Sequence, residues 1–319
     1  MKQKSVFTGL VIFEILIIVF LAFNYIKREK ILHETTVHPL NKADFQFTIS
    51  NDLKHFYEPK PNVSLKNKPD WLDYESTNTI NSDSLNERYD YTTEKPPATY
   101  RIITLGDSMT FGLYLDTNDN FSERLEDMLN SNLQCKNIKK FEVINLGVGG
   151  YDARYVLERY ILRGQKYNPD LVAWFLLDRS LSVYADMFYD VLDYYDNLAN
   201  YSPNPEQLAF RAQREEYNQK NIGEIENYEI NALTSIRKYF NNKLLFFTSP
   251  GLLSSENVNK IKGLTGASQN TFFDDKIGNL TDDNNIVRPG DPHPNAAGSK
   301  IIAQDLYNYL TQNLIDCKK

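Results

Sequence analysis

Short apolar runs alternate with segments of helical spacing from Tyr100 to the end of the chain, and this alternation constrains the fold more than any other feature. β-branched and aromatic runs predict strands, and apolar residues three or four positions apart predict helices. The predicted strands cover residues 101–105, 141–146, 171–177 and 243–248, and the predicted helices cover residues 121–133, 152–166 and 294–314. Strands and helices that alternate in this way form a parallel sheet with helices on both faces. A ligand site is then expected at the carboxyl ends of the strands.

The N-terminus predicts a membrane anchor. Residues 6–26 are almost continuously apolar, and about 20 apolar residues suffice to cross the hydrocarbon core of a bilayer. Basic residues flank both ends of the run, and no small-residue cleavage site closes it. Residues 1–30 are therefore predicted to form an uncleaved, single-pass transmembrane signal anchor. The very short tail before the run favours an extracytoplasmic position for the large domain that follows.

Residues 31–98 form a second region, which begins as a charged, Thr-rich stalk and continues as an extension rich in Asn, Asp and Pro. Prolines interrupt any long helix there, while the stretches FQFTIS and STNTIN are typical of short strands. We expect an irregular extension that packs on the main domain, which spans residues 99–319. Within that domain, an insert at about residues 178–240 is rich in Tyr, Asp, Asn and Glu. This insert is either a lid or substrate wall, or a solvated helical segment.

Charge and cysteine content exclude some classes of partner. The formal net charge of −7 argues against nucleic acid, because a phosphate backbone requires clustered Lys and Arg. Cys135 and Cys317 lack metal-type spacing, so they either pair or stay free. With two cysteines and four histidines in the chain, a zinc site is not expected. No metal or cofactor is predicted, and the predicted partners are an acylated carbohydrate or lipid substrate and the membrane.

A serine and a histidine at opposite ends of the main domain point to nucleophilic catalysis. Gly106, Asp107 and Ser108 follow the first predicted strand, where the serine hydroxyl would project from a strand-to-helix turn and nearby backbone N–H groups would face a developing oxyanion. His293 is the only histidine of the main domain and stands just before the last helix. A serine nucleophile needs a base, and Asp291, two residues earlier, is placed to orient the imidazole.

Four blocks of the sequence resemble, in order, the blocks of the SGNH (GDSL) hydrolases: GDSMTFG, VINLGVGGYDARY, YNPDLVAWF and DPHPNAAG. The resemblance runs from about Tyr100 to the C-terminus, except over the insert. It implies a flavodoxin-like three-layer α/β/α sandwich and ester hydrolysis through an acyl-enzyme. It also implies that Ser108 is the nucleophile, His293 the base and Asp291 its partner, and that the N–H groups of Ser108 and Gly147 contribute to the oxyanion hole.

The chain departs from the family pattern in two places. In many members the acid stands three residues before the histidine, and here that position is Gly290, with Asp291 next to it. The third block of the family reads Gly-x-Asn-Asp, in which the Asn side chain donates to the oxyanion, but this chain reads LLDRS over residues 176–180. The carboxylate of Asp178 would repel an oxyanion. Arg179 aligns with the missing Asn and is either a substitute donor or an exposed surface arginine. The loss of one such donor costs roughly 100–1,000-fold in rate.

Other residues near these blocks are candidates for pocket walls or helix caps. Tyr151 and Tyr155 follow the glycines of the second block and are candidates to line the pocket. Helix caps are expected at Asp152, at Asn295 and at one of residues 118–120, because short polar side chains accept hydrogen bonds from the first turn of a helix.

Together these features predict a membrane-anchored serine esterase that removes O-acetyl or short acyl groups from a cell-envelope carbohydrate or lipid. An anchored domain outside the cytoplasm suits a substrate in the envelope. An O-acyltransferase that delivers the acyl group to an envelope glycan would use the same residues, and product analysis with and without a glycan acceptor separates the two. A non-catalytic envelope-binding module is a third hypothesis, against which the intact Ser, His and Asp set argues.

Overall fold

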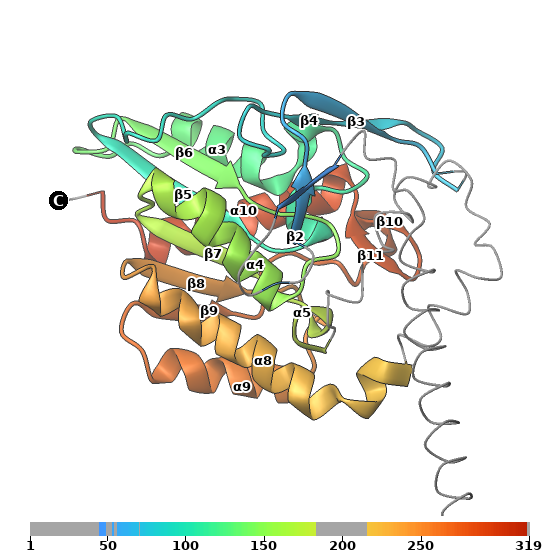
Figure 1. Cartoon of the computed structure of the whole chain (residues 1–319). Helices are drawn as coiled ribbons and strands as arrows, with labels where there is room; N and C mark the ends of the chain where they lie inside the picture. Colours follow the sequence, from blue (N-terminus) through green and yellow to red (C-terminus); the bar gives the residue numbers. More distant parts are fainter. Residues whose placement is uncertain (1–44, 49–52, 54–55, 70, 183–215, 318–319) are drawn as a thin grey trace, which may run out of the picture.

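The computed structural model describes residues 45–48, 53, 56–69, 71–182 and 216–317, and its centre is a five-stranded parallel sheet (Figure 1). The order of the strands across the sheet is β6-β5-β7-β8-β9. Their bounds are Lys140–Asn145 for β6, Thr99–Leu105 for β5, Leu171–Phe175 for β7, Lys243–Phe247 for β8 and Thr271–Asp274 for β9. The predicted strands are confirmed, and β9 at one edge is additional.

The order of the strands decides where a ligand site lies. In chain order the sheet reads 2-1-3-4-5, the flavodoxin-like arrangement, in which the winding reverses between the first and third strands. These strands are β5 and β7, which pair in parallel from Ile102 opposite Leu171 to Leu105 opposite Trp174. Loops that leave their carboxyl ends diverge to opposite faces of the sheet, and a crevice opens between them.

Short elements gather at the end of the sheet toward which the strand arrows point (Figure 1). They are the helices α2 (Ser108–Phe111) and α5 (Asp178–Ser182) and the antiparallel strands β10 (Ile286–Arg288) and β11 (Asp291–Pro294). α2 follows β5 and α5 follows β7, so both helices begin at the predicted location of the site.

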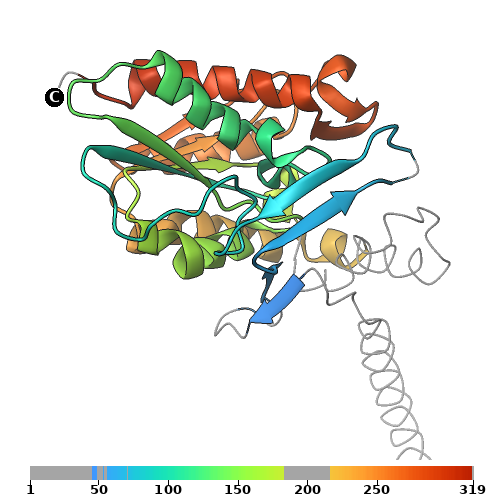
Figure 2. The ribbon, with the colours of Figure 1, turned by 90° about the horizontal axis from the view of Figure 1, so that it is seen from above.

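Helices cover both faces of the sheet (Figure 2). One layer is α3 (Phe121–Asn132) with α10 (Ala296–Asn313), and the other is α4 (Ala153–Arg159) with α8 (Ile222–Ser235) and α9 (Ser255–Gly266). β7 is apolar throughout because both of its faces are covered. Val172 and Trp174 pack in the core with α4, and Leu171, Ala173 and Phe175 pack in the core with α3. The three-layer α/β/α sandwich is therefore confirmed for the described residues.

Side-chain caps set the starts of three predicted helices. Asn120, Asp152 and Asn295 accept hydrogen bonds from first-turn N–H groups of α3, α4 and α10, as expected at those positions. The apolar pattern does not predict α9 or β9. The reason is that Asn257 and Ile261 are the buried residues of α9, and every residue of β9 is half-buried.

The helix predicted over residues 152–166 is less regular than expected. After α4 the chain continues as a π turn (Tyr160–Gly164) and then as a 3₁₀ turn (Gln165–Tyr167). The segment ends at Asn168, whose φ of 49° is left-handed. Pro169 follows, and a proline disfavours the α-helical conformation in the residue before it.

The extension before the main sheet forms two antiparallel hairpins. β1 (Phe45–Thr48) pairs with β2 (Phe56–Pro59), and β3 (Val63–Asn67) pairs with β4 (Ser76–Ile80). Glu58 on β2 is buried and forms ion pairs with Arg159 and Arg163, which lie in and just after α4. The Tyr57 hydroxyl donates to the carbonyl of Gly149 at 2.8 Å. The extension thus reaches the main domain through buried polar groups.

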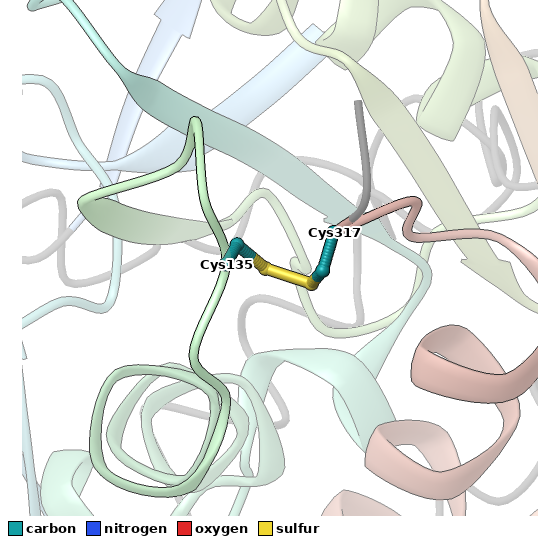
Figure 3. The surroundings of a disulfide bond; sticks show 2 residues. All are labelled: Cys135 and Cys317. Carbon is teal, nitrogen blue, oxygen red and sulfur yellow. A yellow bond between two sulfur atoms is a disulfide. The ribbon is translucent and has the colours of Figure 1, made fainter.

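Cys135 and Cys317 form a disulfide (Figure 3). The bond joins the loop after α3 to the chain that follows α10, across 182 residues of sequence, with the two Cα atoms 4.4 Å apart. The sequence left pairing and free thiols as alternatives, and the structure selects pairing.

Two predictions fall on parts of the chain that the structure does not describe. Across the described ranges, no helix combines the length and apolar character needed to span a bilayer. The anchor predicted over residues 1–30 lies outside those ranges, as does most of the insert, residues 183–215. The anchor therefore stays a prediction, as does a lid over residues 183–215. The later part of the insert is neither a lid nor a solvated segment, because Leu233 of α8 and Ile236 after it are buried in the core.

Candidate active site

A sharp turn after β5 presents Ser108 at the carboxyl edge of the sheet. Asp107 caps α2 by accepting a hydrogen bond from Met109 N at 3.0 Å, and Ser108 is the first residue of the helix. Gly106 enters this turn with a φ of +154°. A Cβ atom at Gly106 would lie 2.2 Å from Thr110 Oγ1, so no other residue fits without displacing the turn.

His293 and Asp291 reach Ser108 from the other end of the chain. Both lie on β11, after a tight turn that links it to β10. Asp291 Oδ1 is 2.5 Å from His293 Nδ1, and His293 Nε2 is 2.8 Å from Ser108 Oγ. The structure therefore brings together the three side chains that sequence motifs singled out. The carboxylate orients one ring nitrogen while the other faces the hydroxyl, which is the arrangement of a Ser–His–Asp triad.

The surroundings of Asp291 favour its ionised form. Burial alone would raise the pKa of this carboxyl, but hydrogen bonds from His293 and the charges of His293 and Arg288 outweigh burial, so the pKa lies below its ordinary value. At neutral pH the residue is therefore an anion able to stabilise an imidazolium.

Gly147 does not supply the expected oxyanion donor. Its N–H donates to Asn145 Oδ1 at 2.9 Å, so the prediction that this N–H points into the hole is wrong. The glycine serves close packing instead, because a Cβ atom there would lie 2.2 Å from Phe111 N in α2. Val148 N donates to Gly106 O at 3.3 Å, which holds the loop after β6 alongside the turn that carries Ser108.

Three other backbone N–H groups are available near this turn. Those of Ser108, Gly149 and Gly150 make no hydrogen bond to any described residue. Ser108 carries the nucleophilic hydroxyl, and the two glycines continue the loop that Val148 holds beside it. N–H groups without partners at the edge of a site are suited to an oxyanion.

The third block places Asp178 and Arg179 at the start of α5. Asp178 Oδ1 accepts hydrogen bonds from Ser254 N at 2.9 Å and from Asn257 Nδ2 at 2.7 Å, so its carboxylate is engaged with the start of α9. Arg179 is exposed. Burial raises the pKa of Asp107, and the positive charge of Arg179 acts to lower it, which puts the guanidinium within electrostatic reach of the Ser108 turn. Its role as a donor stays a prediction.

The two tyrosines proposed as pocket walls are not at the surface. Tyr151 and Tyr155 are 1% and 0% exposed and pack against Phe56 and Tyr57 of the extension. The prediction that they line the pocket is wrong, because β2 of the extension covers them.

A different set of residues lies around His293, and the sequence patterns do not reveal it. The ring of Tyr114 stands edge-on to the ring of His293, with centroids 5.4 Å apart. Trp71 packs edge-on against Tyr114 at 5.0 Å, and the Arg288 guanidinium lies over Trp71 at 4.0 Å. These residues come from three separate segments, so their spacing along the chain carries no signal. The left-handed backbone of Tyr114, with a φ of 68°, is a feature of the structure alone.

The fold and the site define an α/β/α protein with a Ser–His–Asp triad at the carboxyl edge of its parallel sheet. No protein-family model matches the chain, and no curated protein matches it. Among solved structures, the esterase EstA from Pseudoalteromonas sp. aligns at 13% identity and a TM-score of 0.42, over 66% of this chain and 97% of EstA. A family 3 carbohydrate esterase from Clostridium thermocellum aligns at 16% identity and a TM-score of 0.40, over 67% and 96% of the two chains.

A G-D-S-L family protein from Desulfitobacterium hafniense also aligns, at 16% identity and a TM-score of 0.33, over 65% of this chain and 98% of the other. The family named there is the one that the four sequence blocks resemble. At these identities and TM-scores the likeness carries no activity to this chain, and the case for an activity rests on the site itself.

Proposed function

We propose that the chain is a serine esterase whose nucleophile is Ser108. The observation that carries this proposal is the continuous contact from Asp291 Oδ1 through the His293 ring to Ser108 Oγ, at 2.5 Å and 2.8 Å. A serine hydroxyl is a weak nucleophile until an adjacent base accepts its proton. The triad supplies that base at the edge of the sheet where α/β proteins bind ligands.

The reaction proceeds in two halves. Ser108 Oγ attacks the ester carbonyl carbon while His293 Nε2 takes the hydroxyl proton, and Asp291 stabilises the resulting imidazolium. The tetrahedral intermediate collapses with cleavage of the C–O bond, and His293 returns the proton to the departing alkoxide. Water then attacks the acyl-enzyme with His293 again as base, which releases the acid and restores the serine hydroxyl.

The oxyanion is stabilised by backbone groups, in this proposal. The Ser108 N–H and one of the Gly149 and Gly150 N–H groups take the role that the sequence assigned to Gly147. Arg179 adds a positive charge near the same turn and replaces the Asn that the third block lacks.

The substrate class we propose is an O-acetyl or short acyl ester of a cell-envelope carbohydrate or lipid. The apolar run at residues 6–26 supports a single-pass membrane anchor. The Cys135–Cys317 disulfide supports an extracytoplasmic domain, because disulfides persist in oxidising compartments and are rare in the cytosol. An anchored enzyme on that side of the membrane meets acylated envelope components directly.

The test is turnover of p-nitrophenyl acetate by the full chain in detergent, with labelling by a fluorophosphonate. Wild type should hydrolyse the ester and label, while Ser108→Ala should do neither and His293→Ala should lose most of both. Transfer to an added glycan acceptor, with little free acetate released, would move the assignment to an O-acyltransferase. A wild-type protein that folds but neither turns over nor labels would refute the esterase proposal.

A further inference from the structure

We propose that a cavity beside the triad binds a neutral sugar ring of an acylated polysaccharide. This inference rests on the proposed esterase function and names the part of its substrate that the enzyme recognises. The cavity, defined here by Tyr74, Ser76, Tyr114, Asp116 and Asp119, has a volume of about 390 Å³ and is closed on another side by the start of α10. Volumes of about 300–1,000 Å³ are typical of small-molecule sites.

The cavity adjoins the catalytic histidine through one shared wall. Tyr114 lines the cavity, and its ring also stands edge-on to the ring of His293, with centroids 5.4 Å apart. On the other side of His293, Nε2 is 2.8 Å from Ser108 Oγ. The cavity and His293 thus share the Tyr114 side chain as a wall, and in this proposal the acyl group stands on the bound sugar or on its neighbour in the chain.

The aromatic walls suit the C–H face of a pyranose ring. Tyr74 lines the cavity and is 40% exposed, so part of its surface is open to a ligand. Its hydroxyl donates to the Tyr114 carbonyl at 3.1 Å, which orients the ring at the cavity. Tyrosine offers a large apolar surface at a small cost in side-chain entropy, together with a polar tip.

The polar groups of the cavity call for hydroxyl partners. Asp116 Oδ1 accepts from Thr77 N, and Asp119 Oδ1 pairs with Arg124. The second oxygen of each carboxylate makes no hydrogen bond to a described residue. Ser76 is 1% exposed, and its hydroxyl also lacks a partner among the described residues. A buried polar atom such as the Ser76 hydroxyl normally finds a partner. Asp116 is exposed and the Asp119 side chain is 40% exposed, so water solvates their second oxygens until ligand hydroxyl groups replace it.

This combination selects a carbohydrate over a lipid chain and a neutral sugar over an acidic one. A sugar brings hydroxyl donors to the two carboxylates, whereas an acyl chain brings none and would leave them without partners. A carboxylated sugar would meet Asp116 and Asp119 with a charge of the same sign, which is unfavourable.

A second cavity continues from the first and suggests that the ligand is a polymer. It has a volume of about 460 Å³ and includes Asp116, so the two cavities share a wall. Its lining contains Arg88 and Tyr89, and Tyr89 is 51% exposed. The pair of cavities therefore offers two adjacent positions, each with an exposed tyrosine, for consecutive sugars of one chain.

The experiment compares acetylated oligosaccharides with a simple ester on the full chain in detergent. O-acetylated cellopentaose and O-acetylated penta-N-acetylchitopentaose represent neutral polymers, and p-nitrophenyl acetate requires the triad alone. Tyr74→Ala should lower kcat/KM for at least one neutral oligosaccharide about tenfold more than for p-nitrophenyl acetate, because the oligosaccharide would lose its contact with the apolar surface of the ring. Tyr74→Phe keeps the aromatic ring and should therefore retain most of the wild-type kcat/KM for the oligosaccharide. Tyr239→Ala removes another tyrosine that is 40% exposed, far from this edge of the sheet, and should change neither rate.

Two further measurements separate this inference from the proposed function. Ser108→Ala should bind cellopentaose or penta-N-acetylchitopentaose without O-acetyl groups in calorimetry, and adding Tyr74→Ala should weaken that binding. Binding without ester hydrolysis by wild type would sustain the cavity and refute the esterase. Two outcomes would overturn the sugar site while the esterase stands. One is a wild type that hydrolyses p-nitrophenyl acetate but prefers acetylated oligogalacturonate to the neutral oligosaccharides. The other is an equal loss of kcat/KM on the oligosaccharides and on p-nitrophenyl acetate in Tyr74→Ala.

Discussion

The guanidinium of Arg288 lies over the indole ring of Trp71, 4.0 Å from its centroid, and Arg288 Nε is also 3.8 Å from Asp291 Oδ2. Trp71 belongs to the region between β3 and β4, so a residue of the N-terminal extension supports the arginine that faces the triad acid. The extension is thereby connected to the active site by a cation–π contact and an ion pair.

Removing the indole should therefore impair the triad. Trp71→Ala is expected to lower kcat for p-nitrophenyl acetate by up to about tenfold, because Arg288 would no longer be held beside Asp291. A cation–π contact contributes about 0.5–1 kcal/mol at an exposed site and about 2 kcal/mol when desolvated. Trp71→Phe should recover much of the rate. Tyr228→Ala removes the ring under Arg154, at 5.9 Å, and provides a control that should leave kcat unchanged. Equal rates for Trp71→Ala and wild type would show that the contact plays no part in turnover.

Arg179 should matter for kcat rather than for KM. If its guanidinium donates to the oxyanion in place of the missing Asn, Arg179→Ala should reduce kcat roughly 100-fold, the lower end of the loss for one such donor. Arg179→Lys keeps the charge but lacks the planar fork of donors, so its kcat should lie between those of wild type and Arg179→Ala. Steady-state kinetics with p-nitrophenyl acetate measures both constants. A change in kcat of less than twofold for Arg179→Ala would show that Arg179 is not an oxyanion donor and that backbone N–H groups form the oxyanion hole.

Glu126 makes stability depend on pH. It is buried on α3 and accepts hydrogen bonds from Val143 N and the Tyr91 hydroxyl, and burial raises the pKa of its carboxyl from 4.5 to about 7. The folded state thus holds a proton that the unfolded chain releases at a lower pH. The stabilisation that comes from holding this proton is complete below pH 4.5 and is lost as the pH rises through about 7.

Glu126→Gln should consequently stabilise the protein at pH 8 by on the order of 3 kcal/mol, which is the free energy equivalent of that pKa difference. The amide retains an acceptor oxygen but carries no charge. At pH 4 the variant and wild type should unfold at similar denaturant concentrations. Denaturant titrations at the two pH values measure this, and a difference in stability that does not change with pH would contradict the assignment.

Glu58 should be important for the attachment of the extension. Its side chain is buried between Arg159, which is 0% exposed, and Arg163. Glu58→Ala would leave a buried guanidinium without its counter-ion, so a loss of about 3–5 kcal/mol in the free energy of unfolding is expected. Glu75→Ala is the matched control, because Glu75 pairs with Lys66 at the surface and such pairs contribute about 0–1 kcal/mol. Chemical denaturation compares the two, and similar losses would argue against the buried network.

The sequence by itself determined four of the five strands of the sheet and the identity of the triad. β7 was predictable because a strand buried on both faces requires an unbroken apolar run, and residues 171–175 supply one. The caps at Asn120, Asp152 and Asn295 were predictable because the interaction lies within one turn of each helix. Ser108 and His293 stood out through their short motifs at strand and helix ends.

The tertiary structure alone decided which groups meet. The N–H of Gly147 is engaged by Asn145, Tyr151 is covered by the extension, and Tyr114 contacts His293. The disulfide likewise pairs segments 182 residues apart. The physical reason is that periodicity and capping report on neighbours along the chain, whereas these contacts depend on how the hairpins of the extension and the loops after the strands stack on the finished sheet.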